Sequence, residues 1–144
     1  ATRVASLARL LKPGGGLTLM WHVFQNPDLA DPFHDATAGL LSPLPDSPSG
    51  APDSLPFALD RANIKWELTG RDAFSLISYQ QQHWPLVLDS QEIRSLYGGF
   101  SGLSRLPEPE RTSLLDELER IARADFDNAV TRNMTSVMYL FQRT

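Results

Sequence analysis

The hydrophobic positions of the chain follow two different periods. A period near 3.6 residues, typical of amphipathic helices, recurs in 2–12, 31–44, 89–97 and 107–126. Shorter apolar runs with strand character occupy 17–24, 73–84 and 135–142. The first of these runs is apolar on two faces, with Leu17, Leu19 and Trp21 on one and Met20 on the other, which is typical of a strand covered on both sides by helices. The pattern predicts an α/β protein with about three strands and covering helices.

Several helix boundaries are marked by residues with a physical reason to stand there. Pro13 cannot continue the first helix, and the glycines of 14–16 can adopt the positive φ that ends a helix and turns the chain. Asp31 followed by Pro32 is typical of a helix start, with Asp as the N-cap. Asp89 and Glu92 have the spacing of a capping box.

The middle of the chain is less regular. Residues 42–56 hold five prolines and predict a surface loop. For 57–70 the pattern favours a short helix over 57–65 and a short strand at Trp66–Leu68. The strand predicted over 73–84 has three expected anchors, which are Ile77, Tyr79 and Trp84.

Composition and charge narrow the class of protein. The chain has 144 residues, of which 42% are apolar and 21% charged, as expected for a folded domain. Its net charge of −4, with Arg and Lys scattered, argues against a nucleic-acid partner. No segment approaches the ~20 apolar residues of a membrane span, and no secretory signal is visible. The absence of Cys excludes disulfides. We therefore expect a cytoplasmic protein with no membrane partner.

A set of motifs points to a known family. In chain order these are Leu-Leu-Lys-Pro-Gly-Gly-Gly at 10–16, Trp21-His22, Leu-Val-Leu-Asp at 86–89, Tyr-Gly-Gly-Phe-Ser at 97–101, the helix at 108–124, and a last strand closing on Tyr139 and Arg143. Together they resemble the C-terminal part of class I S-adenosylmethionine-dependent methyltransferases. The chain is also similar to one subgroup of that family, the small-molecule methyltransferases of the ubiquinone-biosynthesis and trans-aconitate type.

The resemblance implies a fold and an activity. The fold is the C-terminal half of a Rossmann-like sheet, in which strand 17–24 lies between an absent fourth strand and an antiparallel last strand. The chain is then a single partial domain with a helix-strand-helix part (1–56), an inserted substrate-side region (57–105) and a long helix with the final strand (106–144). The implied activity is methyl transfer to a small molecule.

The cofactor elements of that family are not found in this sequence. The family holds S-adenosylmethionine with a glycine-rich loop after the first strand and an acidic residue at the end of the second. Gly14–Gly16 precede a strand, whereas a cofactor loop follows one and opens a helix. We therefore expect no cofactor-binding residue in this chain and no activity of the chain alone.

The end of strand 17–24 is the best place for a substrate site. In open α/β sheets the ligand crevice lies beyond the carboxyl ends of the parallel strands. Trp21, His22, Phe24 and Asn26 are therefore candidate substrate-binding residues, and Tyr97 joins them from the inserted region. His22 is the candidate catalytic base for an acceptor that must lose a proton, or a hydrogen-bond donor to a substrate carboxylate. The alternative for His22 is a polar strand end that bonds to the backbone.

Other chemically capable residues have simpler interpretations. His34 and His83 are expected to be solvated, because three His without Cys lack the spacing of a metal site. The aromatic side chains of the inserted region line either an acceptor pocket or the core. These residues are Trp66, Tyr79, Trp84, Tyr97 and Phe100.

Two functions from different classes remain open. The first is the substrate-side portion of a methyltransferase, and the alternative is a non-catalytic dimerisation or interaction module derived from that fold. In both, strand 17–24 has an open edge, and such edges pair with other strands. The expected partner along 17–24 is either a missing N-terminal half or a second copy, as in a homodimer.

Overall fold

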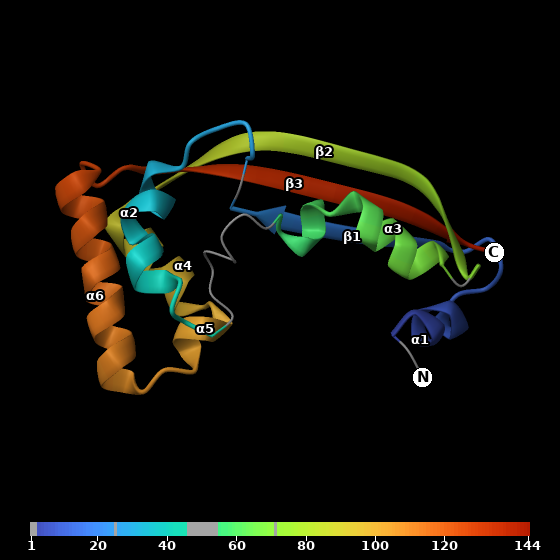
Figure 1. Ribbon diagram of the computed structural model, residues 1–144, viewed down its shortest axis with the longest axis horizontal. Helices are drawn as coiled ribbons and strands as arrows, with labels where there is room; N and C mark the ends of the chain where they lie inside the picture. The colour runs from blue at the N-terminus through green and yellow to red at the C-terminus, as the bar shows by residue number, and fades with distance from the viewer. Residues whose placement is uncertain (1–2, 25, 46–54, 71) are drawn as a thin grey trace. The chain divides into compact units, whose positions relative to one another are not determined.

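The computed structural model describes residues 3–24, 26–45, 55–70 and 72–144 (Figure 1). The described strands are β1 (Gly16–Val23), β2 (Phe74–Leu88) and β3 (Val130–Arg143). The described helices are α1 (Arg3–Leu10), α2 (Pro32–Leu41), the 3₁₀ turn η1 (Phe57–Leu59), α3 (Arg61–Thr69), α4 (Ser90–Gly98), α5 (Ser101–Ser104) and α6 (Glu108–Asp125). The α/β class and the three strands predicted from the pattern are confirmed.

The last strand lies in the middle of the sheet. The strand order is β1-β3-β2, and β1 pairs with β3 antiparallel in continuous register from Gly16↔Gln142 to Val23↔Thr135. The antiparallel last strand beside 17–24 is therefore confirmed. The sequence predicts a mixed sheet, but the sheet formed by the described residues is antiparallel and contains no parallel pair.

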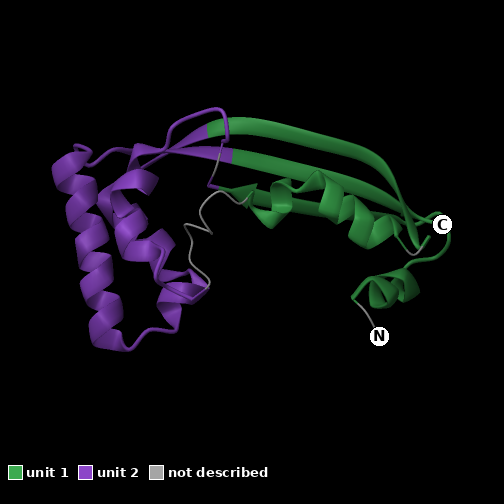
Figure 2. Ribbon diagram, in the orientation of Figure 1, with its two compact units in different colours: residues 1–23, 55–84, 135–144 green, residues 24–54, 85–134 purple. Residues whose placement is uncertain are grey.

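The chain folds as two compact units (Figure 2). Unit 1 comprises 1–23, 55–84 and 135–144, and unit 2 comprises 24–54 and 85–134. Both are built from segments that are distant in sequence, and β2 and β3 each contribute residues to both units. The organisation into 1–56, 57–105 and 106–144 stays a prediction.

Unit 1 buries one face of its part of the sheet. Val137, Tyr139 and Phe141 alternate along β3 and are fully or almost fully buried, as period-two patterning requires. Ile64 and Leu68 of α3 belong to the same core, and α1 packs against it through apolar side chains. The Tyr139 hydroxyl donates a hydrogen bond of 2.8 Å to the carbonyl of Ala58.

The Lys-Pro-Gly-Gly-Gly segment closes this sheet. Gly14 has φ +79°, the left-handed conformation that glycine adopts at low cost. Its N–H donates to the carbonyl of Arg143 at 2.9 Å, and Arg143 in turn donates to the carbonyl of Gly15 at 2.8 Å. The turn therefore aligns the start of β1 with the end of β3.

Unit 2 is built around α6. Leu115, Leu118, Ile121 and Ala122 form its buried stripe, which packs with buried side chains of α2 and α4. The two predicted helix starts are confirmed. The Asp31 side chain accepts from the N–H of His34, and Asp89 and Glu92 form the reciprocal capping box.

The structure corrects three sequence-based predictions. Trp66–Leu68 is not a strand but part of α3, because Ile64 and Leu68 point together into the core and leave Trp66 72% exposed. Ile77 is 54% exposed and anchors nothing, whereas Phe74 of the same strand is buried.

The third correction concerns β1, which the sequence predicts to be covered on both faces. Along β1 the core face alternates with exposed side chains, and Met20 is 62% exposed, so the described residues cover only one face of this strand.

The loop predicted over 42–56 falls mostly on 46–54, which lie outside the described residues.

The glycine turn gives a matched pair of variants. Gly14→Ala should destabilise the fold by roughly 1 kcal/mol because of its positive φ, although a methyl group there meets no atom within 4 Å. Gly39→Ala also meets no atom, but Gly39 lies in α2, where alanine should stabilise by about 0.5–1 kcal/mol. Urea denaturation measures both, and equal effects would contradict the role given to φ.

Tyr139 gives a prediction at alkaline pH. Burial raises the pKa of Tyr139 to about 12 from its ordinary value of 10. The contribution of the neutral phenol to stability is complete below pH ~10 and is lost as pH rises from there through about 12. Denaturation curves across this window should show a smaller decline for Tyr139→Phe than for the wild type. Parallel declines would mean that another group is responsible.

Candidate functional site

The predicted site residues fall in different parts of the structure. Trp21 and His22 belong to unit 1, and Phe24, Asn26 and Tyr97 belong to unit 2. Phe24 and Tyr97 meet around one buried side chain, Arg132, which the sequence analysis did not single out.

Arg132 is the central charge of this group. It lies near the start of β3, is 2% exposed, and its Nε donates to Asp31 Oδ2 at 2.9 Å. Its Nη1 donates to the hydroxyl of Tyr97. A charged, almost fully buried guanidinium requires such partners, because an unpaired charge at this depth is very costly.

Aromatic rings surround the guanidinium. Its central carbon lies 4.9 Å from the ring centre of Phe24 and 5.7 Å from that of Phe33, within cation–π distance. Phe100 packs edge-to-face against Phe24 at 5.9 Å and against Tyr97 at 5.2 Å. We call these residues the arginine–aromatic cluster: Phe24, Asp31, Phe33, Tyr97, Phe100 and Arg132.

The cluster has a defined protonation pattern. Burial raises the pKa of Tyr97, and the positive charge of Arg132 opposes this increase. The phenol is therefore neutral at physiological pH and accepts from Arg132, so Asp31 supplies the counter-charge. The result is an ion pair of fixed orientation that connects the start of α2 with β3.

Arg132 could have been found from the sequence. It stands between Val130 and Met134 at a spacing of two residues, and both of these side chains are buried. In a strand, such spacing places all three side chains on one face. A charged residue on an apolar strand face is the signal, and the predicted strand boundary at 135 excluded it.

Asn26 has a structural role in the loop after β1. Its side-chain oxygen accepts from the N–H of Asp28 at 3.1 Å, and its carbonyl accepts from Leu29 at 3.1 Å. This is an Asx-type turn, which occupies the side-chain oxygen with the backbone.

His22 and Trp21 lie on opposite faces of β1. Trp21 packs edge-to-face against Tyr139 at 6.0 Å and is part of the core packing. His22 Nδ1 lies 2.7 Å from Ser136 Oγ, which also accepts from Trp84 Nε1 at 2.7 Å. An indole N–H only donates, so Ser136 Oγ accepts from Trp84, and its contact with Nδ1 holds the His22 ring on the exposed face of β1.

The remaining histidines bring no further chemistry together. His83 lies between Gln81 and Thr135 in a hydrogen-bonded row on β2 and β3, with distances of 3.0 and 2.8 Å. His34 lies in the first turn of α2. Among the residues that the structure describes, no group of three or more His, Cys, Asp or Glu is placed to hold a metal ion.

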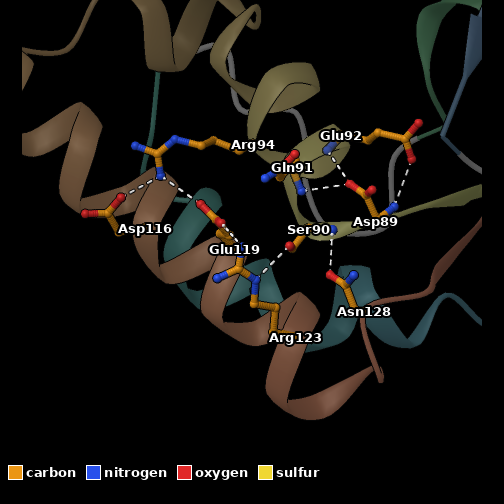
Figure 3. A network of polar contacts seen from close by, with 9 residues as sticks. All are labelled: Asp89, Ser90, Gln91, Glu92, Arg94, Asp116, Glu119, Arg123 and Asn128. Carbon is orange, nitrogen blue, oxygen red and sulfur yellow. Dashed lines mark hydrogen bonds and ion pairs between the residues drawn. The ribbon is translucent and has the colours of Figure 1, made fainter.

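A second polar network joins α4 to α6 (Figure 3). Arg94 pairs with Asp116 at 2.5 Å and Glu119 at 3.2 Å, and Arg123 bonds to both Glu119 and the hydroxyl of Ser90. The Asp116 carboxylate is thus an exposed ion-pair partner. The network joins α4 to α6.

The glycine turn at 14–16 is closed by backbone hydrogen bonds. The glycines of the 14–16 turn are used in the pairing with Arg143, and a Cβ at Gly15 would lie 2.8 Å from the carbonyl of Lys12. The turn therefore closes on itself instead of opening a cradle for a nucleoside. Where the structure describes the chain, no glycine loop leads from a strand into a helix.

Comparison with known proteins adds no relative. The chain matches no protein-family model and no curated protein sequence. Within the described ranges, none of the helices combines the length and the apolar character needed to cross a membrane.

The ion pair of the arginine–aromatic cluster can be tested by its two partners. Asp31→Asn keeps the helix cap but removes the counter-charge, and Arg132→Met removes the guanidinium; each should cost about 3 kcal/mol of unfolding free energy. Urea denaturation of both variants and of the double variant gives the coupling between them.

The matched control is an exposed pair of the same chemistry. Glu117 and Arg120 are joined at 2.8 Å on the surface of α6, and Glu117→Gln should leave stability unchanged. If Asp31→Asn were equally harmless, the Arg132 ion pair would not be needed for the fold.

Proposed function

We propose that the chain is the substrate-side portion of an S-adenosylmethionine-dependent methyltransferase that acts on a small molecule. The observation that carries the proposal is the sheet order β1-β3-β2 with β1 antiparallel to β3. This is the arrangement expected if the motif-bearing strand 17–24 belongs to the C-terminal half of a Rossmann-like sheet. The proposal therefore rests on two supports, the strand order of the sheet and the motifs in the sequence.

In the proposed function, the arginine–aromatic cluster belongs to the end of the sheet at which we expect the methyl acceptor to bind. Phe24 directly follows β1, and Arg132 lies near the start of β3, so both come from the chain end at which a Rossmann-like crevice opens. Methyl transfer depends strongly on alignment of the acceptor. In this proposal the cluster holds the loop after β1 and the Tyr97 region rigid, and thereby shapes one wall of the acceptor site.

His22 keeps a narrower role in the proposal. Its Nδ1 is engaged with Ser136, so Nε2 is the ring nitrogen left for contact with a ligand. Through Nε2, His22 would contact the methyl acceptor as a base or as a hydrogen-bond donor.

In this proposal the cofactor is held by residues other than those described. S-adenosylmethionine would supply the transferable methyl group, and the residues described here offer no cradle for it. We therefore assign it to other residues of the active assembly, and derive no step through it.

The alternative is a non-catalytic interaction module with the same topology. Two observations on β1 favour it. The Met20 side chain is largely accessible on one face of the strand, and no described strand pairs with its outer edge. A module of this kind would bind through β1 and need no cofactor.

Calorimetric titration with S-adenosylmethionine separates the two functions. The chain alone should give no binding heat. The chain fused behind the cofactor-binding half of a class I methyltransferase, joined at the Leu-Lys-Pro-Gly-Gly position, should bind the cofactor and transfer a labelled methyl group to small acceptors. Binding by the unfused chain would contradict the reading of 14–16 as a closing turn.

The fusion also needs a control for the acceptor wall. Phe24→Ala in the fusion should weaken methyl transfer while leaving cofactor binding unchanged, because Phe24 belongs to the cluster and not to the cofactor half. A fusion that folds but neither binds cofactor nor transfers methyl would favour the interaction module.

A further inference from the structure

β1 forms one margin of the described sheet. It pairs with β3 on one side, and no described strand lies on the other. The opposite margin, β2, contains Pro85, a residue that blocks strand addition because it has no N–H. β1 has no such protection, since Gly16–Val23 contains neither proline nor a charged residue.

The ladder determines which backbone groups of β1 are available. The backbone N–H of Arg143 donates to the carbonyl of Gly15. From there each step forward along β1 is matched by one step back along β3, without a bulge. Hydrogen-bonded and non-hydrogen-bonded pairs alternate in an antiparallel ladder. The backbone groups of Leu17, Leu19 and Trp21 therefore point to β3, and those of Thr18, Met20 and His22 point to the open edge.

A side-chain contact supports this assignment. His22 and Ser136 are register partners, and their side chains are in hydrogen-bond contact at 2.7 Å. Side chains approach more closely in non-hydrogen-bonded pairs. The backbone N–H and C=O of His22 are thus not used by β3.

We propose that the open edge of β1 pairs antiparallel with β1 of a second copy of this chain, with Met20 opposite Met20 of the partner. In this register Thr18 faces His22, and Thr18, Met20 and His22 of each copy enter hydrogen-bonded pairs. Leu19 lies opposite Trp21 on the other face, so the apolar core face continues from one sheet into the next. In the complete sheet of the proposed function a strand of the cofactor-binding half would pair with this same edge, so the inference concerns the chain without that half.

A second copy fits this edge better than a strand of different sequence. Two-fold pairing needs a segment that is complementary to itself, and an uncharged strand meets its own copy without like-charge repulsion. The chain as a whole carries a net charge of −4, so a neutral contact strip is the part of its surface where two copies approach with the least cost.

Charge placement at Met20 tests both the partner and the register. The wild-type chain should be a dimer by light scattering at micromolar concentration. Met20→Lys and Met20→Glu should each weaken the dimer about fivefold or more, because each places two like charges opposite each other at the two-fold axis. Mixing the two variants should restore the dimer, since opposite charges then meet.

The controls separate this contact from general adhesion and from misfolding. Ile77→Lys removes an exposed apolar side chain from β2 and should leave the dimer unchanged. Hydrogen exchange in the wild type should show protection of the Met20 amide that disappears on dilution, while the Leu19 amide stays protected by β3.

Three outcomes would overturn the proposal. These are a wild-type monomer at all concentrations tested, a dimer that neither variant weakens, and variants whose mixture stays monomeric. A Met20 amide that remains protected after dilution to monomer would also contradict it, because the edge would then be covered within one chain.

Discussion

The pairing of β1 with β3 is the constraint on which the rest of the structure depends. It joins residues that are more than a hundred positions apart, as the contact of His22 with Ser136 illustrates. The core of unit 1 exists because this ladder brings Trp21 beside Tyr139, and α1 and α3 pack onto the face so formed. The glycine turn at 14–16 sets the register through Arg143. Without the ladder, the apolar stripes of α1 and α3 have no surface to cover.

Unit 2 is organised by a different kind of interaction. Its helices share an apolar core, but the loop after β1 is fixed by a buried charge, since Arg132 bonds to Asp31 and Tyr97 and contacts Phe24. Replacing such an ion pair by apolar residues of similar volume is often neutral for stability, so its presence is weak support for stability alone. An oriented charge does fix which side chains face one another. In the proposed function, this orientation would hold one wall of the acceptor site in place.

Local chemistry was the part of the fold that the sequence could predict. The starts of α2 and α4 follow from Asp31-Pro32 and from Asp89 with Glu92, because capping depends on residues within one turn. The partner of β1 was predicted from the motif order and not from any local pattern. Trp66 and Ile77 were misplaced because burial depends on which neighbour covers a face, and this is long-range information. Arg132 was missed for a local reason, because the strand was predicted to begin at 135, so Phe24 and Tyr97 were named without their common partner.

The position of β3 in the middle of the sheet has a consequence for folding. β1 is synthesised before β3 and can complete its ladder only after 135–142 have been made, and closing so long a loop is entropically costly. During this interval the nascent chain presents an uncharged strand with both edges unpaired, which invites aggregation. Expression of this protein should therefore benefit from chaperone capacity more than its size suggests.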